Sequence, residues 1–175
     1  LIPVLRGELP LIISAERMDD ILTALRIAEE FNLKIILNGG AEAYKVKEKL
    51  VSKNIPVLLR PRAAYGLTVE TGGARLDNAA ILQKAGLRIG FETGSVENLG
   101  DLLPQARIAI THGLAYKDAL NALTINPAEI FGVQDRLGSI EKGKSADLVV
   151  FEGDPLTSAA RLKIVIIAGE VVENF

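Results

Sequence analysis

This 175-residue chain has very few of the nitrogen and sulfur side chains that bind transition metals, and it has no thiol nucleophile. The sequence holds no cysteine and a single histidine, His112. A single copy of the chain can therefore form no disulfide, and it offers zinc neither a thiolate ligand nor a site of several histidines. A Ser-His-Asp triad stays arithmetically open, but Ser14 lies far away in the sequence and no acid is evidently placed to orient the ring. We interpret His112 as a partly exposed helix residue rather than a ligand.

The composition indicates one globular domain and excludes several classes of partner. Hydrophobic residues make up 49% of the chain and charged residues 24%, and the formal net charge is −2. This balance argues against nucleic-acid binding and against a polybasic membrane-surface protein. No apolar run approaches the roughly 20 residues of a membrane span, and no signal peptide is visible. We expect neither nucleic acid nor membrane as partner. The missing cysteine fits cytoplasm or periplasm, with the cytoplasm slightly favoured.

The first hundred residues alternate short apolar runs with amphipathic stretches. Runs that are apolar throughout and separated by helices are typical of a parallel sheet covered on both faces. The pattern predicts strands at 9–14, 34–37, 56–60 and 87–91, and helices at 19–31, 41–53 and 77–85. The glycine-containing connection at 61–76 is predicted to be a flexible loop, whose Arg62, Tyr65 and Arg75 are candidate contacts for an anionic ligand.

The second part of the chain follows another pattern. Short helices are predicted at 102–115, 117–123 and 127–131, the last with Pro127 in its first turn. A strand at 147–151 and a β-hairpin joining 163–167 to 171–172 should follow. The tail is thus a small β element appended to an α/β body.

Several of these segments resemble one known family. The run at 119–128 (ALNALTINPA) leads into 137–149 (LGSIEKGKSADLV), and GDP at 153–155 and the closing strands at 165–172 follow. This resembles the C-terminal signature of the amidohydrolase superfamily, in its imidazolonepropionase-like and prolidase-like branch. Residues 9–20 and 39–45 resemble later barrel strands and helices of that branch.

The resemblance implies an α/β fold, a TIM-type (β/α)8 barrel with a small β-sandwich built from both chain ends. We expect residues 1–135 to supply four βα units, barrel strands five to eight, and residues 136–175 the C-terminal strands of the sandwich. A half-barrel leaves open sheet edges at its first and fourth strands. Either a homo-oligomer or a missing N-terminal half is expected to cover these edges, and in the latter case the chain is a piece of something longer.

The resemblance also implies chemistry. Enzymes of this superfamily hydrolyse C–N bonds with zinc or another divalent metal, which lowers the pKa of a bound water and polarises the carbonyl. They place a histidine at the end of strands five and six and an aspartate, also the proton shuttle, at the end of strand eight. Ser14, Gly39 and Gly94 stand at these positions here. A serine and two glycines cannot hold zinc, so we expect this chain to contribute no metal site.

Three side chains remain as candidates at the mouth of the barrel: Ser14, Asn38 and Glu92. Glu92 lies two residues before Gly94, so strand alternation turns both to the same side. Since buried charges are usually paired, we interpret Glu92 as the partner of Arg60 or Arg62 rather than as a metal ligand. A small molecule is the ligand that such a mouth would take.

Three hypotheses for function stay open, and whether the chain is an enzyme stays open with them. The first is an amidohydrolase-like protein that has lost metal-dependent hydrolysis and is catalytically degenerate. The second is an active metal-dependent amidohydrolase seen as a fragment or completed by a partner chain. The third is a half-barrel that dimerises to enclose a symmetric binding cavity.

Overall fold

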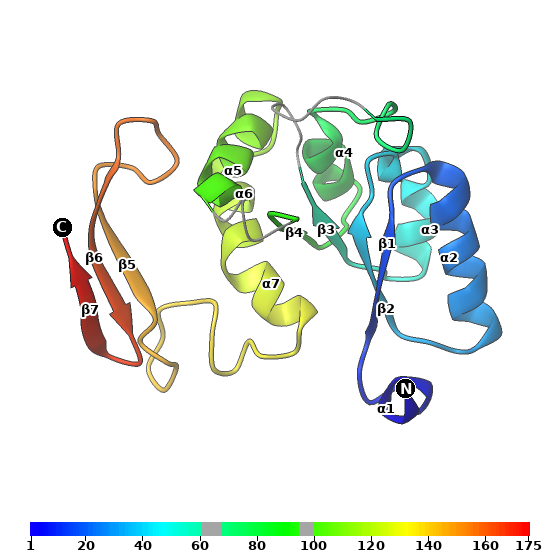
Figure 1. Cartoon of the computed structure of the whole chain (residues 1–175), viewed down its shortest axis with the longest axis horizontal. Helices are drawn as coiled ribbons and strands as arrows, with labels where there is room; N and C mark the ends of the chain where they lie inside the picture. Colours follow the sequence, from blue (N-terminus) through cyan, green and yellow to red (C-terminus); the bar gives the residue numbers. More distant parts are fainter. Residues whose placement is uncertain (61–67, 95–99) are drawn as a thin grey trace.

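A four-stranded parallel sheet forms the centre of the structure. The computed structural model describes residues 1–60, 68–94 and 100–175. Within these residues the strands follow the chain in the order β1-β2-β3-β4, and each is hydrogen-bonded to the next (Figure 1). Their bounds are Leu11–Ala15 (β1), Ile35–Gly39 (β2), Val57–Leu59 (β3) and Ile89–Phe91 (β4). The four predicted strands are confirmed.

Helices cover one face of this sheet because every second strand residue is apolar and turned toward them. Leu37 and Leu59 are almost completely buried there, together with Ile21, Leu50 and Leu82 from the helices. Burial of this apolar surface is the main stabilising contribution to the sheet–helix packing. The helices are α2 (Met18–Glu30), α3 (Lys47–Ser52) and α4 (Asn78–Lys84), with a 3-10 turn η1 (Ala43–Lys45) before α3 and a short α1 (Ile2–Leu5) at the N-terminus.

The predicted helix at 41–53 was wrong in its first half. The chain has left-handed φ at Gly40 (65°) and passes through η1 before α3 begins. Val46 separates the two at φ −124°, ψ 18°, outside the helical region. The apolar spacing there reflects two short segments that each bury one apolar residue: η1, which contacts α2 and α4, buries Ala43, and α3 buries Leu50.

The opposite face is only partly covered, so the prediction of a sheet covered on both faces fails at β1. Ile36 and Leu58 pack against Ile130 of α7 (Ile125–Ile130). A Cβ added to Gly90 of β4 would lie 3.3 Å from Cγ of Pro127, so the glycine allows α7 to approach closely. At the other end of the sheet Ile12 remains 50% exposed.

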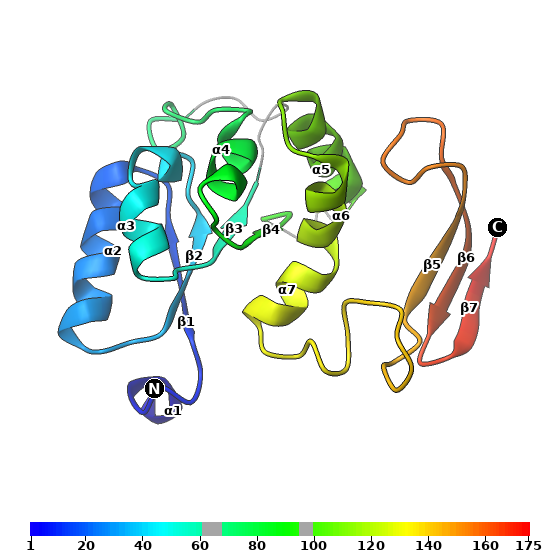
Figure 2. The same cartoon turned by 180° about the vertical axis from the view of Figure 1, so that it is seen from behind.

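The remainder of the chain adds two helices and a separate antiparallel sheet. α5 (Leu102–Thr111) and α6 (Tyr116–Leu123) precede α7, and the sheet consists of β5 (Leu148–Glu152), β6 (Arg161–Ile167) and β7 (Glu170–Asn174). Both views place this sheet to the side of α5 and α6 (Figure 2). The predicted hairpin is confirmed as β6–β7. The predicted boundary between residues 135 and 136 falls in the connection from α7 to β5.

The segment between β5 and β6 attaches the small sheet to the body. Leu156 is buried in the main core. Arg107 Nη2 donates to the Pro155 carbonyl at 2.9 Å, and the Tyr116 hydroxyl donates to Asp154 Oδ1 at 2.6 Å. Much of the sheet itself is exposed, including 60% of Val149. Among the described residues, no helix is long and apolar enough to cross a membrane.

Candidate functional site at the carboxyl edge of the parallel sheet

The carboxyl ends of the four parallel strands bring the predicted site residues to one edge of the sheet. Ser14 and Asn38 are register partners in β1 and β2, and Asn38 Nδ2 donates to Ser14 Oγ at 3.1 Å. Arg60 and Glu92 follow directly after β3 and β4, two residues beyond Leu58 and Gly90 of the partly covered face. We call Ser14, Asn38, Arg60, Glu92 and Gly94 the mouth cluster.

Glu92 forms an ion pair with Arg60 across the ends of β3 and β4. Arg60 Nη2 donates to Glu92 Oε1 at 2.6 Å, and the side chains are only 17% and 16% exposed. The prediction that Glu92 is paired with an arginine is therefore confirmed for Arg60, whereas Arg62 lies outside the described residues. Arg60 Nε is buried and makes no hydrogen bond within the described part of the chain.

Gly94 makes room for this guanidinium. Its φ is +79°, and a Cβ added there would lie 1.7 Å from both Cζ and Nη2 of Arg60. Such a contact is impossible, so no residue with a side chain could occupy position 94 while Arg60 stays where it is. The position at which the resemblance expects an aspartate is thus filled by a cation from the neighbouring strand.

Gly39 shows the corresponding feature with the opposite charge. A Cβ added to this residue, whose φ is +94°, would lie 2.7 Å from the carboxyl carbon of Glu16. Glu16 Oε2 also accepts a hydrogen bond from the Ala41 amide at 3.0 Å. Sequence reasoning missed Glu16, although its place two residues after Ser14, on the same side of an extended strand, is a usable signal.

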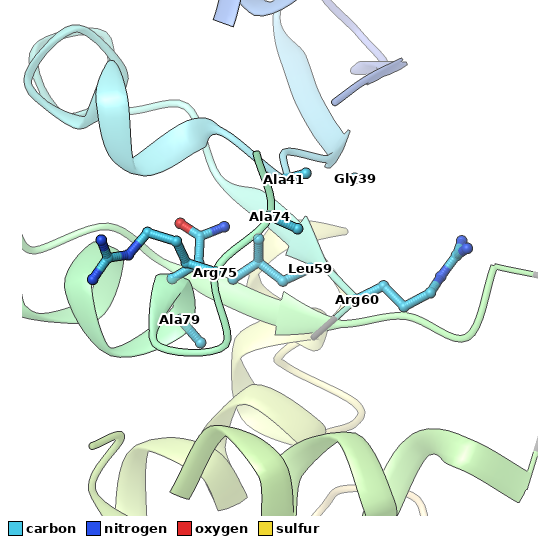
Figure 3. Close-up of a pocket in the computed structure, with 8 residues that line it drawn as sticks. Gly39, Ala41, Leu59, Arg60, Ala74, Arg75 and Ala79 are labelled. Carbon is cyan, nitrogen blue, oxygen red and sulfur yellow. The ribbon is translucent and has the colours of Figure 1, made fainter. Parts of the chain in front are cut away.

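The cavity beside the mouth cluster is small. It has a volume of about 20 Å³ and is lined by residues that include Gly39, Arg60, Arg75 and Asn78. This is room for a single water molecule, so a larger ligand would have to bind on the open edge of the sheet outside this cavity. Arg60 and Arg75 extend from it in opposite directions (Figure 3). Asn78 is buried and donates from Nδ2 to the Gly40 carbonyl at 2.9 Å, so it fixes the turn after β2.

Of the loop residues predicted to contact an anion, Arg62 and Tyr65 lie outside the described residues. Arg75 donates through Nε and Nη2 to both carboxylate oxygens of Asp77, at 2.8 and 2.6 Å. These hydrogen bonds hold the pKa of Asp77 below its ordinary value. The Arg75 guanidinium also lies 5.4 Å from the centre of the Tyr44 ring. Arg75 is therefore committed to neighbours within the chain.

His112 lies at the C-terminal end of α5, where it is exposed. Its Nδ1 is 2.8 Å from the Ile108 carbonyl, one turn back in the helix. This placement agrees with our interpretation of His112 as a helix-end residue. In the parts of the chain that the structure describes, no three His, Cys, Asp or Glu side chains converge to hold a metal ion.

Comparisons with known proteins place the chain in a family. The model of the amidohydrolase family matches residues 23–172, so the chain belongs to that family. It is 32% identical over 127 residues to an imidazolonepropionase of Flavobacterium psychrophilum, covering 73% of the chain and 29% of the relative. It is 29% identical over 165 residues to the amidohydrolase tasK of Hapsidospora irregularis, covering 75% of the chain and 17% of that protein.

A solved structure is similar over almost the whole chain. The amidohydrolase from Thermotoga maritima superposes with a TM-score of 0.94 at 40% identity, over 99% of this chain and 45% of that one. The chain thus spans less than half the length of these relatives. The predicted superfamily is confirmed, and with it a TIM-barrel-type α/β fold.

Proteins of this family generally use divalent metals, but the mouth cluster does not fit such an ion. Ser14 and Asn38 offer a hydroxyl and an amide, which are weak ligands for zinc. Glu92 offers a carboxylate, but that carboxylate is bonded to a guanidinium. Because Arg60 neutralises the charge of Glu92, the pair offers a divalent cation no net negative charge. We derive no catalytic step through a metal at this edge.

Proposed function

We propose that this chain is the C-terminal half of an amidohydrolase-family barrel that has lost metal-dependent hydrolysis of C–N bonds and keeps its carboxyl edge as a binding surface for small molecules. The observation that supports the proposal most strongly is the Arg60 guanidinium packed against Gly94. It places a cation where the resemblance expects a metal-binding carboxylate, and this cation neutralises Glu92, the carboxylate of the mouth cluster.

The remaining polar groups support the same proposal. Hydrolysis requires a base or a metal to activate water. Among the described residues, two carboxylates lie at this edge: Glu92 is ion-paired with Arg60, which draws its negative charge away from a water molecule, and Glu16 accepts a hydrogen bond from the Ala41 amide. Ser14 accepts a hydrogen bond from Asn38, and neither side chain is a base.

A second candidate is an active amidohydrolase to which this chain contributes half a barrel. It is favoured by the extent of the similarity, since the chain corresponds to 45% of the Thermotoga maritima structure. In that case ligands from outside this chain would hold the metal. This candidate also bears on what pairs with the outer strands β1 and β4. We propose that either the remaining half of a barrel or a second copy of the chain pairs with them.

Hydrolysis assays on this chain test the proposal. N-acyl amino acids and a cyclic amide would be incubated with the protein in the presence of zinc or manganese, and amine release would be followed. We expect the same background rate for the chain and for Glu92→Gln, which removes the only carboxylate of the mouth cluster while keeping its shape. Metal-dependent release that is lost in Glu92→Gln would contradict the proposal.

A further inference from the structure

The guanidinium of Arg60 has properties of a ligand anchor as well as of an ion-pair partner. The Arg60 side chain is largely buried, with only 17% of its surface exposed. Among the described residues its one hydrogen-bond acceptor is Glu92, although a guanidinium carries five N–H donors. A buried donor without an acceptor is energetically costly, so such a group favours an additional acceptor oxygen nearby.

The position of this guanidinium is fixed before any ligand arrives. Glu92 holds Nη2, and the absent side chain of Gly94 lets the planar group lie against the backbone. A preorganised guanidinium loses little conformational entropy when it binds, and its parallel N–H bonds match the two oxygens of a carboxylate. Arg75 differs from Arg60 in its burial and in its free donors. Its side chain is half-exposed, and it already donates two hydrogen bonds to Asp77.

A second polar group lies on the adjacent strand. Asn38 pairs in register with Leu58, and Arg60 follows two residues later, directly after β3. Asn38 uses one amide hydrogen on Ser14 Oγ and keeps a second. A ligand with a carboxylate for Arg60 and a separate hydrogen-bond acceptor for Asn38 would match both groups.

We propose that Arg60 anchors the carboxylate of a small organic acid at the carboxyl edge of the sheet, with Asn38 as a second contact. This deepens the proposed function, on which it rests, by giving the charge class of the small molecule. Because Glu92 balances Arg60, the site carries no excess positive charge. A carboxylate is then selected by geometry more than by long-range attraction, and a minimal acid such as acetate should bind in the millimolar range.

Titration followed by NMR tests this proposal on the whole chain. Acetate and its neutral isostere acetamide would be added separately at constant ionic strength, while the Gly94 amide and Arg60 Nε–Hε signals are observed. We expect saturable shifts with acetate and none with acetamide. Arg60→Gln should weaken acetate binding about tenfold or more, because it removes the charge-assisted contacts.

Arg75→Gln is the matched control, since it also removes one guanidinium beside the small cavity and should bind acetate like the unmodified chain. Circular dichroism of both variants checks that the fold is kept. Three results would overturn the proposal: no saturable acetate shift up to about 100 mM, far above the expected range; equal shifts with acetamide; or unchanged acetate binding in Arg60→Gln. Its failure is distinguishable from that of the proposed loss of hydrolysis, which is contradicted by metal-dependent amine release and not by the absence of acetate binding.

Discussion

Where a glycine stands in place of an expected metal ligand, neighbouring side chains move into the space that the ligand's side chain would fill. At position 94 the missing side chain creates space that Arg60 fills, and at position 39 the missing side chain creates space beside Glu16. Charged side chains from neighbouring strands therefore occupy the space in which the Cβ atoms of the family's metal ligands would lie. Each of these glycines also has positive φ, which a residue with a Cβ adopts only at a cost in free energy.

Restoring a side chain at position 94 should therefore disturb the Arg60–Glu92 pair. We expect Gly94→Ala to lower the free energy of unfolding by about 2–4 kcal/mol, from backbone strain together with displacement of a largely buried ion pair. Gly86→Ala is the matched control: Gly86 has φ +91° but nothing within 4 Å of an added Cβ, so it reports the strain alone, about 1–2 kcal/mol. Urea unfolding measures both. Equal losses in the two variants would contradict the account of Gly94 as space for Arg60.

At the residue scale, sequence reasoning found part of the site. The family resemblance, together with strand alternation, predicted that Ser14, Asn38 and Glu92 lie at one edge, and the rule that buried charges are paired predicted that Glu92 meets an arginine. They could not reveal that Arg60 lies against Gly94, because this depends on the separation of two strands 32 residues apart in the chain. Alternation puts Glu16 on the same side as Ser14, but it does not specify that the Glu16 carboxylate turns to Gly39 and the Ala41 amide.

At the scale of elements, apolar runs predicted the four parallel strands and the hairpin, since these signals are strong and local. Two features depended on tertiary contacts. The helix at 41–53 is divided because Gly40 and Val46 leave helical dihedrals, while both pieces still bury apolar residues. The uncovered face at β1 depends on where α7 packs, which no periodicity encodes.

The attachment of the small sheet through Tyr116 and Asp154 should depend on pH. The Tyr116 hydrogen bond, with help from the Leu156 amide, holds the pKa of Asp154 below its ordinary value, and Asp154 in turn raises the pKa of Tyr116. A carboxylate whose pKa is lower in the folded state stabilises the fold, and this stabilisation is fully present above the ordinary aspartate pKa of about 3.9. The stabilisation is lost as the pH falls through the lower pKa of the folded state. The contribution of Tyr116 is present below about pH 10 and is lost as pH rises through its raised pKa.

Thermal unfolding across the acid range measures this effect. Asp154→Asn should unfold at a lower temperature than the unmodified chain at neutral pH, and the difference should shrink below about pH 4. Asp135→Asn, at another exposed aspartate, controls for the loss of one negative charge. A difference between the chain and Asp154→Asn that stays constant down to the acid limit would rule out this role for Asp154.

At the scale of the whole molecule, the described part of the parallel sheet has an exposed apolar face and no further strand beside β1 or β4. The Ile89 carbonyl of β4 accepts a hydrogen bond from Asn126 Nδ2 of α7, so β1 is the more open of the two edges. β1 and β4 are its outer strands, and Ile12 on the partly covered face is 50% exposed. Exposed strand edges of this kind pair readily with other chains.

The isolated chain should therefore self-associate. Sedimentation velocity is expected to show dimers or larger species whose fraction rises with protein concentration. Ile12→Lys should reduce this association because a charge is introduced beside the open edge. Ile140→Lys is the control, at a residue that is 87% exposed in the connection before β5. A chain that stays monomeric, or an association that Ile12→Lys does not reduce, would count against pairing at β1.

The central claim is that this chain does not build a metal centre at the carboxyl edge of its sheet. Elemental mass spectrometry of the purified protein, grown with added zinc, iron and manganese and checked by intact mass, tests it most directly. The account predicts far less than one metal ion per chain, with no difference between the protein and Glu92→Gln. Close to one ion per chain, lost in Glu92→Gln, would contradict it and would make Glu92 a metal ligand.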